Sequence, residues 1–119
     1  MEVKTLVLGA SLNPQRYSYK AVVSLTKKGH GVIAFGLREG FLGSVKILTE
    51  LPQESIDTVT MYLNPKRQEE YYVYLQNLKP RRVIFNPGTE NFELISLLEK
   101  EGVICEIACT LVLLSIGSY

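Results

Sequence analysis

Residues 3–36 read VKTLVLGASLNPQRYSYKAVVSLTKKGHGVIAFG, and this stretch decides the fold that we expect. An apolar run over residues 3–8 ends in a Gly-Ala-Ser turn at 9–11, an amphipathic segment follows, and residues 32–35 form a second apolar run. This order predicts a β-strand, a tight turn, a helix and a second strand. Because such a crossover joins parallel strands, the turn should lie at the carboxyl edge of the sheet, where open α/β folds bind ligands.

The turn after the first strand carries groups that suit a phosphate. Asn13 is a good helix N-cap and Pro14 suits the first helical position, so the free N–H groups of the helix would point back at the turn. Gly9 lets the backbone turn sharply and approach a ligand. Ser11 adds a hydroxyl, and Arg16, expected in the first helical turn, adds a positive charge.

The match to a dinucleotide-binding fingerprint is incomplete. Of G-x-G-x-x-G only the first glycine is present, as Gly9, because Ser11 and Pro14 stand at the other two glycine positions. The acidic residue that binds a bare ribose is absent directly after the second strand, where residues 36–38 read GLR. A basic residue at Arg38 suits a ribose that carries a phosphate, as in NADP and coenzyme A. Alternatively, the turn is purely structural and Arg38 is a solvated surface residue.

Composition places the chain among globular proteins and excludes several classes of partner. Hydrophobic residues make up 46% and charged residues 21% of its 119 residues, which predicts a single domain over residues 1–119. A net charge of +1 gives no reason to expect nucleic acid or an anionic membrane as partner. Neither a signal peptide nor a bilayer-length apolar run is visible, so we expect a cytoplasmic protein. One histidine and two cysteines are too few for a zinc site or a disulfide framework.

The rest of the chain alternates strand and helix patterns. We expect strands at 45–48 (an edge strand), 56–63, 82–85 and 103–107, and helices from Pro65 to Lys79, from a cap at Thr89 to Gly102, and over 110–116. Residues 38–43 interrupt the pattern and predict a mobile lid. Tyr72 and Tyr74 lie off the apolar stripe of their helix and are candidates for a homodimer contact. The alternation predicts an α/β fold with a doubly wound, mainly parallel sheet of about five strands in three layers, αβα.

A family resemblance rests on the motifs Gly-Ala-Ser at 9–11, Asn-Pro at 13–14, Arg-Tyr-Ser at 16–18 and Gly-His-Gly-Val-Ile at 29–33. The chain resembles the small single-domain CoA-binding proteins, which are similar to the CoA-binding domain of the succinyl-CoA synthetase α-subunit. The likeness extends through residues 56–59 and 86–88 to Cys109. It implies a Rossmann-like fold that binds the ADP portion of coenzyme A.

The resemblance also implies a set of binding residues. The phosphates would be held by Gly9, Ser11, Asn13, Pro14 and Arg16; the adenosine would lie by the segment after Ile33, with Gly36 and Arg38; and Leu63, Asn64 and Gly88 would close the pocket. Two departures affect this assignment. Many members end the second strand in Asn-Pro, where residues 35–37 here read FGL, and many carry Trp and Gln before the late glycine, where residues 85–87 read FNP.

No catalytic constellation is apparent, because the chain lacks a Ser/His/Asp set and a well-spaced carboxylate pair. His30 is expected between helix and strand, far from the ligand edge. Cys109, just before the last helix, is the one candidate reactive group and would form a mixed disulfide with coenzyme A; alternatively it is a packing cysteine, as we expect for Cys105. We therefore expect a protein that binds coenzyme A or acyl-CoA without catalysis, the alternatives being an NADP(H)-binding oxidoreductase-like domain and a scaffold without a ligand.

Overall fold

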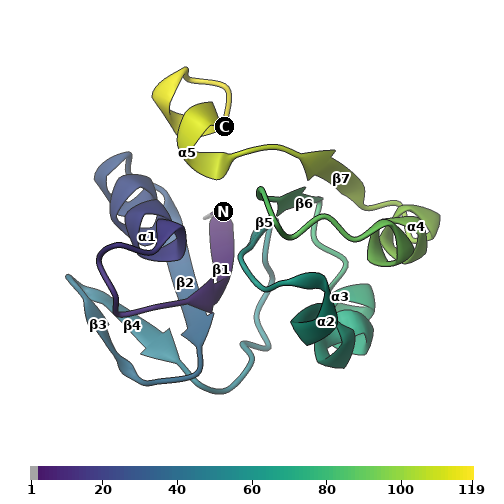
Figure 1. Ribbon diagram of the computed structural model, residues 1–119, viewed down its shortest axis with the longest axis horizontal. Coiled ribbons are helices and arrows are strands. Elements are labelled where there is room, and N and C mark those ends of the chain that lie inside the picture. Colours follow the sequence, from purple (N-terminus) through teal and green to yellow (C-terminus); the bar gives the residue numbers. More distant parts are fainter. Residues whose placement is uncertain (1–2) are drawn as a thin grey trace.

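Seven strands form one sheet in the computed structural model, which describes residues 3–119 (Figure 1). The strands are β1 (Lys4–Ala10), β2 (Gly31–Gly36), β3 (Gly40–Leu42), β4 (Val45–Leu48), β5 (Thr58–Met61), β6 (Arg82–Phe85) and β7 (Ile104–Ile107). Their order across the sheet is β3-β4-β2-β1-β5-β6-β7, and every neighbouring pair is parallel except β3 and β4. The predicted α/β class with a doubly wound, mainly parallel sheet is confirmed, and β3 is the strand that the sequence did not predict.

Helices cover both faces of the sheet. They are α1 (Tyr17–Lys27), α2 (Pro65–Gln68), the 3-10 turn η1 (Glu69–Tyr71), α3 (Tyr72–Leu78), α4 (Phe92–Lys100) and α5 (Thr110–Ser115). The side chains of the central strand β1 alternate between two cores: Leu6 and Leu8 pack with residues of α3 and α4, and Val7 packs with residues of α1 and α5. All three are fully buried, and burying a side chain of this size contributes about 1.5–3 kcal/mol. The alternation of period two therefore produces the three layers.

Helix α1 begins later than the sequence predicts. The side chain of Asn13 accepts a hydrogen bond from the N–H of Gln15 (3.0 Å), and its carbonyl accepts one from the N–H of Arg16 (3.0 Å). These bonds close a turn before the helix starts, because an asparagine side chain offers the backbone an alternative to helical hydrogen bonding. Arg16 is the N-cap residue, with extended backbone, and Tyr17 is the first helical residue. The predictions that Asn13 caps the helix and that Pro14 and Arg16 lie in its first turn are wrong.

Residues 38–43 contribute a strand rather than a lid. Strand β3 pairs antiparallel with β4 through a tight turn in which Gly43 has φ +62°, so β3 forms the edge of the sheet and β4 lies inside it. Lys46 on β4 pairs with Glu39 (3.6 Å). Leu12, from the turn after β1, lies over Gly40, where a Cβ would approach it to 2.6 Å. The predictions of a lid and of an edge position for residues 45–48 are wrong, because two glycines that read as breakers instead permit a hairpin.

Two helices of the second half also differ from expectation. The segment after Pro65 is not one continuous helix, because η1 separates α2 from α3. Helix α4 is capped by Asn91, whose side chain accepts the N–H of Leu94 (3.1 Å), whereas the Thr89 hydroxyl donates to the carbonyl of Asn86 (2.7 Å). The prediction of Thr89 as the cap is wrong. Among the helices of residues 3–119, none has the length and apolar character that crossing a membrane requires.

The tyrosines expected at a subunit contact are occupied within the chain. The hydroxyl of Tyr72 donates to Glu93 (2.9 Å), and that of Tyr74 donates to the carbonyl of Pro52 (2.8 Å). Both rings pack against the core on the α3–α4 side of the sheet. These polar groups are therefore not available to a second subunit, and a homodimer stays a prediction.

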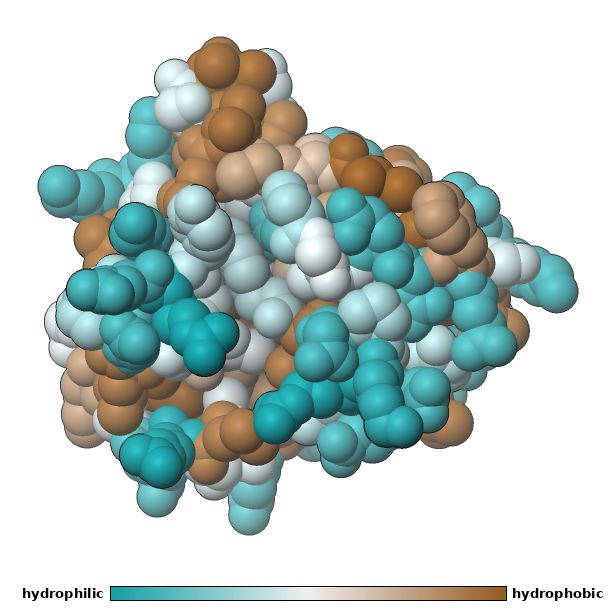
Figure 2. Space-filling view, viewed as in Figure 1, coloured by the Kyte–Doolittle hydropathy of each residue, from teal (hydrophilic) through white to brown (hydrophobic). Residues whose placement is uncertain are grey.

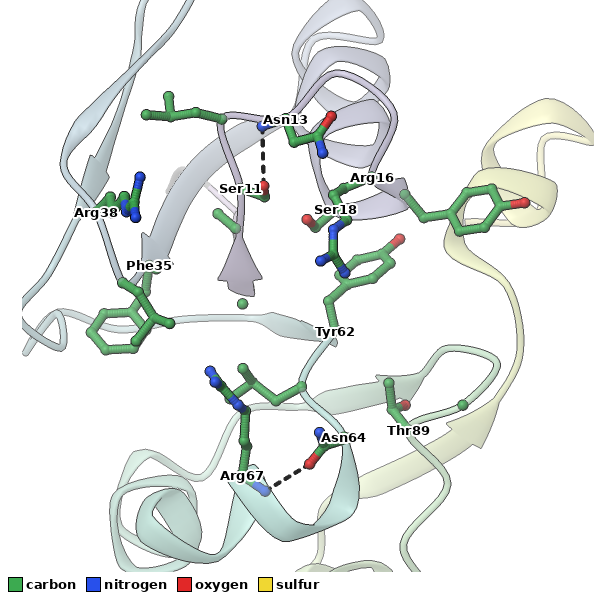
Figure 3. Close-up of a pocket in the computed structure, with 18 of the residues that line it drawn as sticks. Ser11, Asn13, Arg16, Ser18, Phe35, Arg38, Tyr62, Asn64, Arg67 and Thr89 are labelled. Carbon is green, nitrogen blue, oxygen red and sulfur yellow. Dashed lines mark hydrogen bonds between the residues drawn. The ribbon is translucent and has the colours of Figure 1, made fainter.

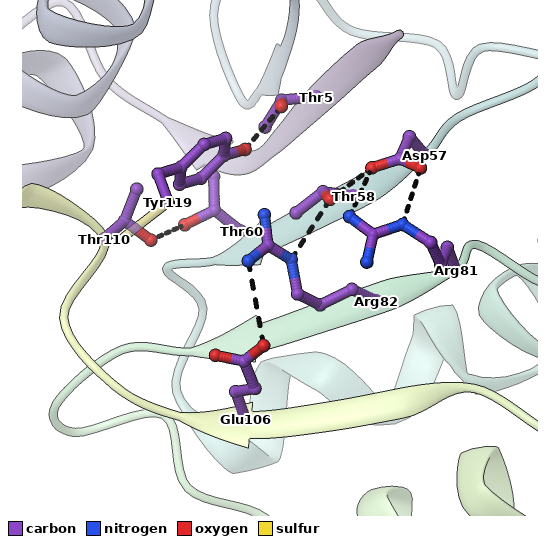
Figure 4. Close-up of polar contacts among 9 residues, drawn as sticks. All are labelled: Thr5, Asp57, Thr58, Thr60, Arg81, Arg82, Glu106, Thr110 and Tyr119. Atoms are coloured by element: carbon purple, nitrogen blue, oxygen red, sulfur yellow. Dashed lines mark hydrogen bonds and ion pairs between the residues drawn. The ribbon is translucent and has the colours of Figure 1, made fainter. Parts of the chain in front are cut away.

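Two arginines form ion pairs at the amino edge of the sheet (Figure 4). Asp57 accepts two hydrogen bonds from Arg81, at Nε (2.9 Å) and Nη2 (3.1 Å). The buried guanidinium of Arg82 lies 4.6 Å from the ring centroid of Tyr119, and its Nη1 is 3.7 Å from Glu106. The ring of His30 also meets Tyr119 edge-on (4.9 Å between centroids), which places the histidine at this edge as predicted.

Candidate functional site

A cavity of about 770 Å³ lies at the carboxyl edge, where β1, β2, β5 and β6 end (Figure 3). This volume is within the range of small-molecule sites. Most of the residues predicted to bind the ligand line it: Gly9, Ser11, Asn13, Arg16, Gly36, Arg38, Leu63, Asn64 and Gly88. Pro14 and Cys109 are outside the lining, Pro14 in the turn before α1 and Cys109 as the N-cap residue of α5. The structure thus brings together the predicted set apart from these two.

Two glycines let the strand ends approach closely beneath the cavity. Gly9 has φ +102°, and a Cβ there would lie 3.1 Å from the carbonyl carbon of Tyr62. A Cβ on Gly36 would lie only 2.3 Å from the carbonyl oxygen of Ala10. A side chain at Gly36 would collide with backbone, whereas a Cβ at Gly9 would be strained by the positive φ and would also lie 3.1 Å from the side chain of Leu63. The cavity floor therefore depends on glycine at the ends of β1 and β2.

The N-terminus of α1 opens into the cavity without a cap. Its N-cap residue makes no side-chain hydrogen bond to the helix, and its first turn contains no acidic residue. By contrast, Asn64 caps α2, and Asn91 caps α4, which also has Glu93 in its first turn. Tyr17 and Ser18, the first two residues of α1, line the cavity. Uncapped N–H groups and the helix dipole make this end suited to an anion.

The turn between β1 and α1 is already shaped for a ligand. The hydroxyl oxygen of Ser11 accepts a hydrogen bond from the N–H of Asn13 (3.0 Å). Since a hydroxyl both donates and accepts, the Ser11 proton remains available to a ligand oxygen. The Asn13 carboxamide oxygen accepts from Gln15, which leaves its NH₂ group as a second donor on the turn. The turn can therefore donate hydrogen bonds to an anion without first rearranging.

Three of the five arginines line this cavity, and they differ from the other two in their partners. Arg81 and Arg82 form the ion pairs of the amino edge. Arg16, Arg38 and Arg67 form no ion pair and no side-chain hydrogen bond within residues 3–119. They come from three segments: Arg16 from the turn before α1, Arg38 from the loop after β2, and Arg67 from α2 (Figure 3). The cavity thus has positive charge on three sides.

Aromatic side chains form an apolar part of the lining. The rings of Phe35 and Tyr71 meet edge-on, with centroids 5.6 Å apart, and Tyr62 lies near the N-terminus of α1 (Figure 3). Burial raises the pKa of Tyr62 to about 12. Burial also raises the pKa of Tyr71, and the nearby carboxylate of Glu70 adds to the effect. Both phenols are therefore neutral at physiological pH and can donate hydrogen bonds.

Sequence reasoning missed Arg67, Tyr62, Phe35 and Tyr71. One signal could have indicated Arg67: a helix that starts directly after a strand places its first turn at the carboxyl edge, where the ligand site was expected. No comparable signal exists for the aromatic residues, which read as core.

Figure 2 shows hydrophilic residues around the hollow between α1 and α2, whereas apolar side chains gather over α5, where Val112 and Ile116 are exposed.

Cys105 behaves as the predicted packing residue. Burial raises the pKa of its thiol to about 11, with a smaller effect from Glu99, so the thiol stays protonated at neutral pH. A protonated thiol is a poor nucleophile and a poor metal ligand.

Within residues 3–119 no group of three or more His, Cys, Asp and Glu side chains could hold a metal ion.

Comparison with known proteins identifies the family. The sequence profile described as CoA binding domain matches residues 3–115. The chain belongs to this CoA binding domain family. Coenzyme A is accordingly the small-molecule partner that the family membership supports, and NADP receives no such support.

Solved structures agree with the fold of this CoA-binding domain. The crystal structure of an uncharacterized protein is 45% identical and has a TM-score of 0.94, with 100% of this chain and 99% of that chain covered. A protein from Thermus thermophilus is 20% identical, with a TM-score of 0.86 over 99% of this chain and 91% of that one. A dinucleotide-forming acetyl-coenzyme A synthetase from Ca. Korarchaeum cryptofilum, in complex with phosphate and ADP, is 14% identical, with a TM-score of 0.72 over 86% of this chain and 25% of that chain. A search of curated proteins found no match.

Proposed function

We propose that the cavity binds coenzyme A or an acyl-CoA and holds its pyrophosphate at the turn between β1 and α1. The observation that carries the proposal is the gathering of Arg16, Arg38 and Arg67, without internal ion pairs, around the uncapped start of α1. Coenzyme A carries two phosphates in its pyrophosphate and a third on its ribose. Guanidinium groups and helix N-termini are the groups that proteins use to bind phosphate.

The strand order indicates on which side of β1 each half of the bound coenzyme A lies. The end of β2 lies on one side of β1, and the ends of β5 and β6 lie on the other. Arg38 follows β2, so the adenosine and its ribose phosphate belong on that side, as a basic residue there suits a phosphorylated ribose. With the pyrophosphate over β1, the pantetheine arm extends over Leu63, Gly88 and Thr89 at the ends of β5 and β6.

The lining supports binding rather than catalysis. Among the described residues of the cavity, Glu70 is the one carboxylate, and neither a histidine nor a cysteine is present. General acid–base catalysis needs a positioned proton donor or acceptor near the reacting atoms, and nucleophilic catalysis needs an activated side chain. We therefore propose a CoA carrier or sensor that releases its ligand unchanged.

Thermal unfolding of the protein with different nucleotides tests the ligand. A ligand at about 100 times its Kd should add about 2.7 kcal/mol to the free energy of unfolding. We expect coenzyme A to give the largest stabilisation and dephospho-CoA a smaller one, because the ribose phosphate is then missing. Equal stabilisation by the two would remove the ribose phosphate from the recognition. A larger effect of NADP than of coenzyme A would favour the oxidoreductase-like alternative.

Arginine variants test the residues. Arg16→Ala and Arg38→Ala should each weaken CoA binding by about 10- to 100-fold in isothermal titration, since a hydrogen bond to a charged group contributes about 1.5–3 kcal/mol. Lys28→Ala is the matched control, because it removes one positive charge from the opposite end of α1. Unchanged affinity in both arginine variants would place the phosphates elsewhere.

A further inference from the structure

The buried side chain of Gln68 is the feature that the proposed function does not yet use. Gln68 ends α2, between the exposed residues Arg67 and Glu69, yet its exposed fraction is 0%. Glutamine is mostly found at the surface, and burying an amide is unfavourable unless its hydrogen bonds are made. The position of this amide therefore calls for an explanation in its contacts.

Those contacts join two loops of the cavity. The Nε2 group of Gln68 donates one hydrogen bond to the carbonyl of Leu63 (2.8 Å) and another to the carbonyl of Thr89 (2.8 Å). Leu63 belongs to the loop after β5 and Thr89 to the loop after β6, and both residues line the cavity. Because both acceptors are backbone carbonyls, the NH₂ group must face them, which fixes the orientation of the amide.

A second amide holds the other end of Gln68. Asn91 Nδ2 donates to Gln68 Oε1 (3.0 Å) and to the hydroxyl of Tyr72 (2.9 Å), while Asn91 Oδ1 caps α4. The Tyr72 hydroxyl in turn donates to Glu93. Rotation of the Gln68 amide would therefore break hydrogen bonds at both of its ends, so the group behaves as a rigid tie.

Past the last paired residues of β5 and β6, few other hydrogen bonds join the loops that follow these two strands. Pairing of β5 with β6 ends at Met61 and Phe85, and just beyond it the Asn86 side chain donates to the carbonyl of Met61 (2.8 Å). Farther out, where Leu63 and Thr89 line the cavity, the Gln68 amide bridges the loops. Next to Thr89 is Gly88, which has φ +90° and no atom within 4 Å of a Cβ, so no side chain packs over the backbone at that position.

We propose that Gln68 is a positioning residue for the pantetheine arm of coenzyme A, which it serves by setting the separation of Leu63 and Thr89. This inference rests on the proposed function and on the direction of the ligand derived above. Gln68 does not line the cavity, so it acts through the two backbone segments that it ties. The adenosine side of the cavity, at the end of β2, is outside its reach. Loss of the tie should therefore affect one half of the ligand and spare the other.

Two ligands separate positioning from a general loss of structure. Adenosine 3′,5′-bisphosphate carries the adenosine and ribose phosphate of coenzyme A but lacks the pantetheine arm. Gln68→Met keeps the length of the side chain and removes both donors. We expect it to weaken CoA binding about tenfold in isothermal titration, which corresponds to about 1.4 kcal/mol, because the carbonyls of Leu63 and Thr89 are then no longer held together. The Kd of the bisphosphate should stay within about twofold, a difference smaller than about 0.5 kcal/mol.

A second variant covers the case in which Gln68→Met does not fold. Asn91→Asp keeps the oxygen that caps α4 and removes the NH₂ group that holds Gln68. It should show the same selective loss of CoA affinity. Tyr74→Phe is the control, because it removes the hydrogen bond from α3 to the carbonyl of Pro52 in the loop between β4 and β5, and neither residue lines the cavity. It should leave the affinities for both ligands unchanged.

The outcomes distinguish the two proposals. Equal weakening of both ligands by Gln68→Met and Asn91→Asp, or no weakening of either, would overturn the positioning role while leaving CoA binding by the wild-type protein intact. Failure of the wild-type protein to bind coenzyme A would overturn the proposed function itself. A selective loss for coenzyme A, absent in Tyr74→Phe, supports both.

Discussion

Asp57 connects the stability of the protein to pH. The two hydrogen bonds from Arg81 hold the pKa of its carboxyl below the ordinary value for an aspartate, with Thr58 acting in the same direction and partial burial opposing. A carboxyl whose pKa is depressed by folding stabilises the folded state above its unfolded pKa, and the contribution is lost as the pH falls through the folded pKa. Asp57→Asn should therefore destabilise the protein at pH 7 by up to about 1 kcal/mol, because Arg81 is largely exposed to solvent.

Urea denaturation of wild type and Asp57→Asn between pH 7 and pH 3 measures this contribution. The difference in free energy of unfolding should shrink as the pH falls below about 4, the unfolded pKa of an aspartate. In an Arg81→Gln background the same substitution should have little effect at any pH, since the partner is gone. A difference that is independent of pH would show that Asp57 acts through its shape and not through its charge.

At the scale of the element, the ends of β1 and β2 depend on Gly36. A Cβ at this position would lie 2.3 Å from the carbonyl oxygen of Ala10, so Gly36→Ala must push the two strands apart. We expect a loss of about 1–3 kcal/mol or more in the free energy of unfolding, together with weaker CoA binding, because the cavity floor moves.

Gly43→Ala is the matched substitution in the β3–β4 hairpin, measured by the same denaturation and titration. Gly43 has φ +62° and no atom within 4 Å of a Cβ, so its replacement should cost about 1–2 kcal/mol of backbone strain and leave binding unchanged. A larger effect on CoA affinity from Gly43→Ala than from Gly36→Ala would contradict the role assigned to the close approach of β1 and β2.

Helices and strands were predictable from the sequence where the local pattern of apolar residues and glycines determines their positions. Apolar runs of strand length gave every parallel strand, and Gly29 and Gly102 marked helix ends correctly, with φ of +84° and +82°. The start of α1 was not predictable, because asparagine followed by proline suits a turn as well as a cap. Strand β3 was missed because it exists only through pairing with β4, a tertiary contact that glycine-rich sequence does not reveal.

In the candidate site, too, some residues were predictable from local sequence and others depend on tertiary contacts. Residues near the Gly-Ala-Ser turn were predictable because a crossover between parallel strands fixes the position of that turn. Arg67 and Gln68 both belong to α2, whose position after β5 indicates only that its first turn lies at the carboxyl edge. Although they are adjacent in sequence, Arg67 is exposed in the cavity and Gln68 is buried. The hydrophobic periodicity of the segment does not predict this difference.

For the whole molecule, the net charge hides how charge is distributed. Thirteen basic and twelve acidic residues nearly cancel, so the chain as a whole should attract an anion weakly. Yet the arginines at the amino edge are neutralised by Asp57 and Glu106, whereas those at the cavity are not. The positive field is therefore strongest at the carboxyl edge, where three arginines outnumber the one carboxylate of the described lining, Glu70, and a predominantly positive cleft can raise the association rate of an anion about 10- to 1000-fold.

This distribution predicts that CoA binding depends on salt although the protein is nearly neutral. Raising the ionic strength to about 1 M shortens the Debye length to about 3 Å, so the association rate in stopped-flow measurements should fall about tenfold or more. The dependence on salt should be flatter in Arg38→Gln, because one of the three free guanidinium groups is gone, and unchanged in Lys28→Gln at the far end of α1. Uncharged pantetheine, which offers the arginines no phosphate, should bind equally well at low and high salt. If the rate for coenzyme A proved insensitive to salt, the three arginines would have no part in capturing the phosphates, whatever ligand the cavity holds.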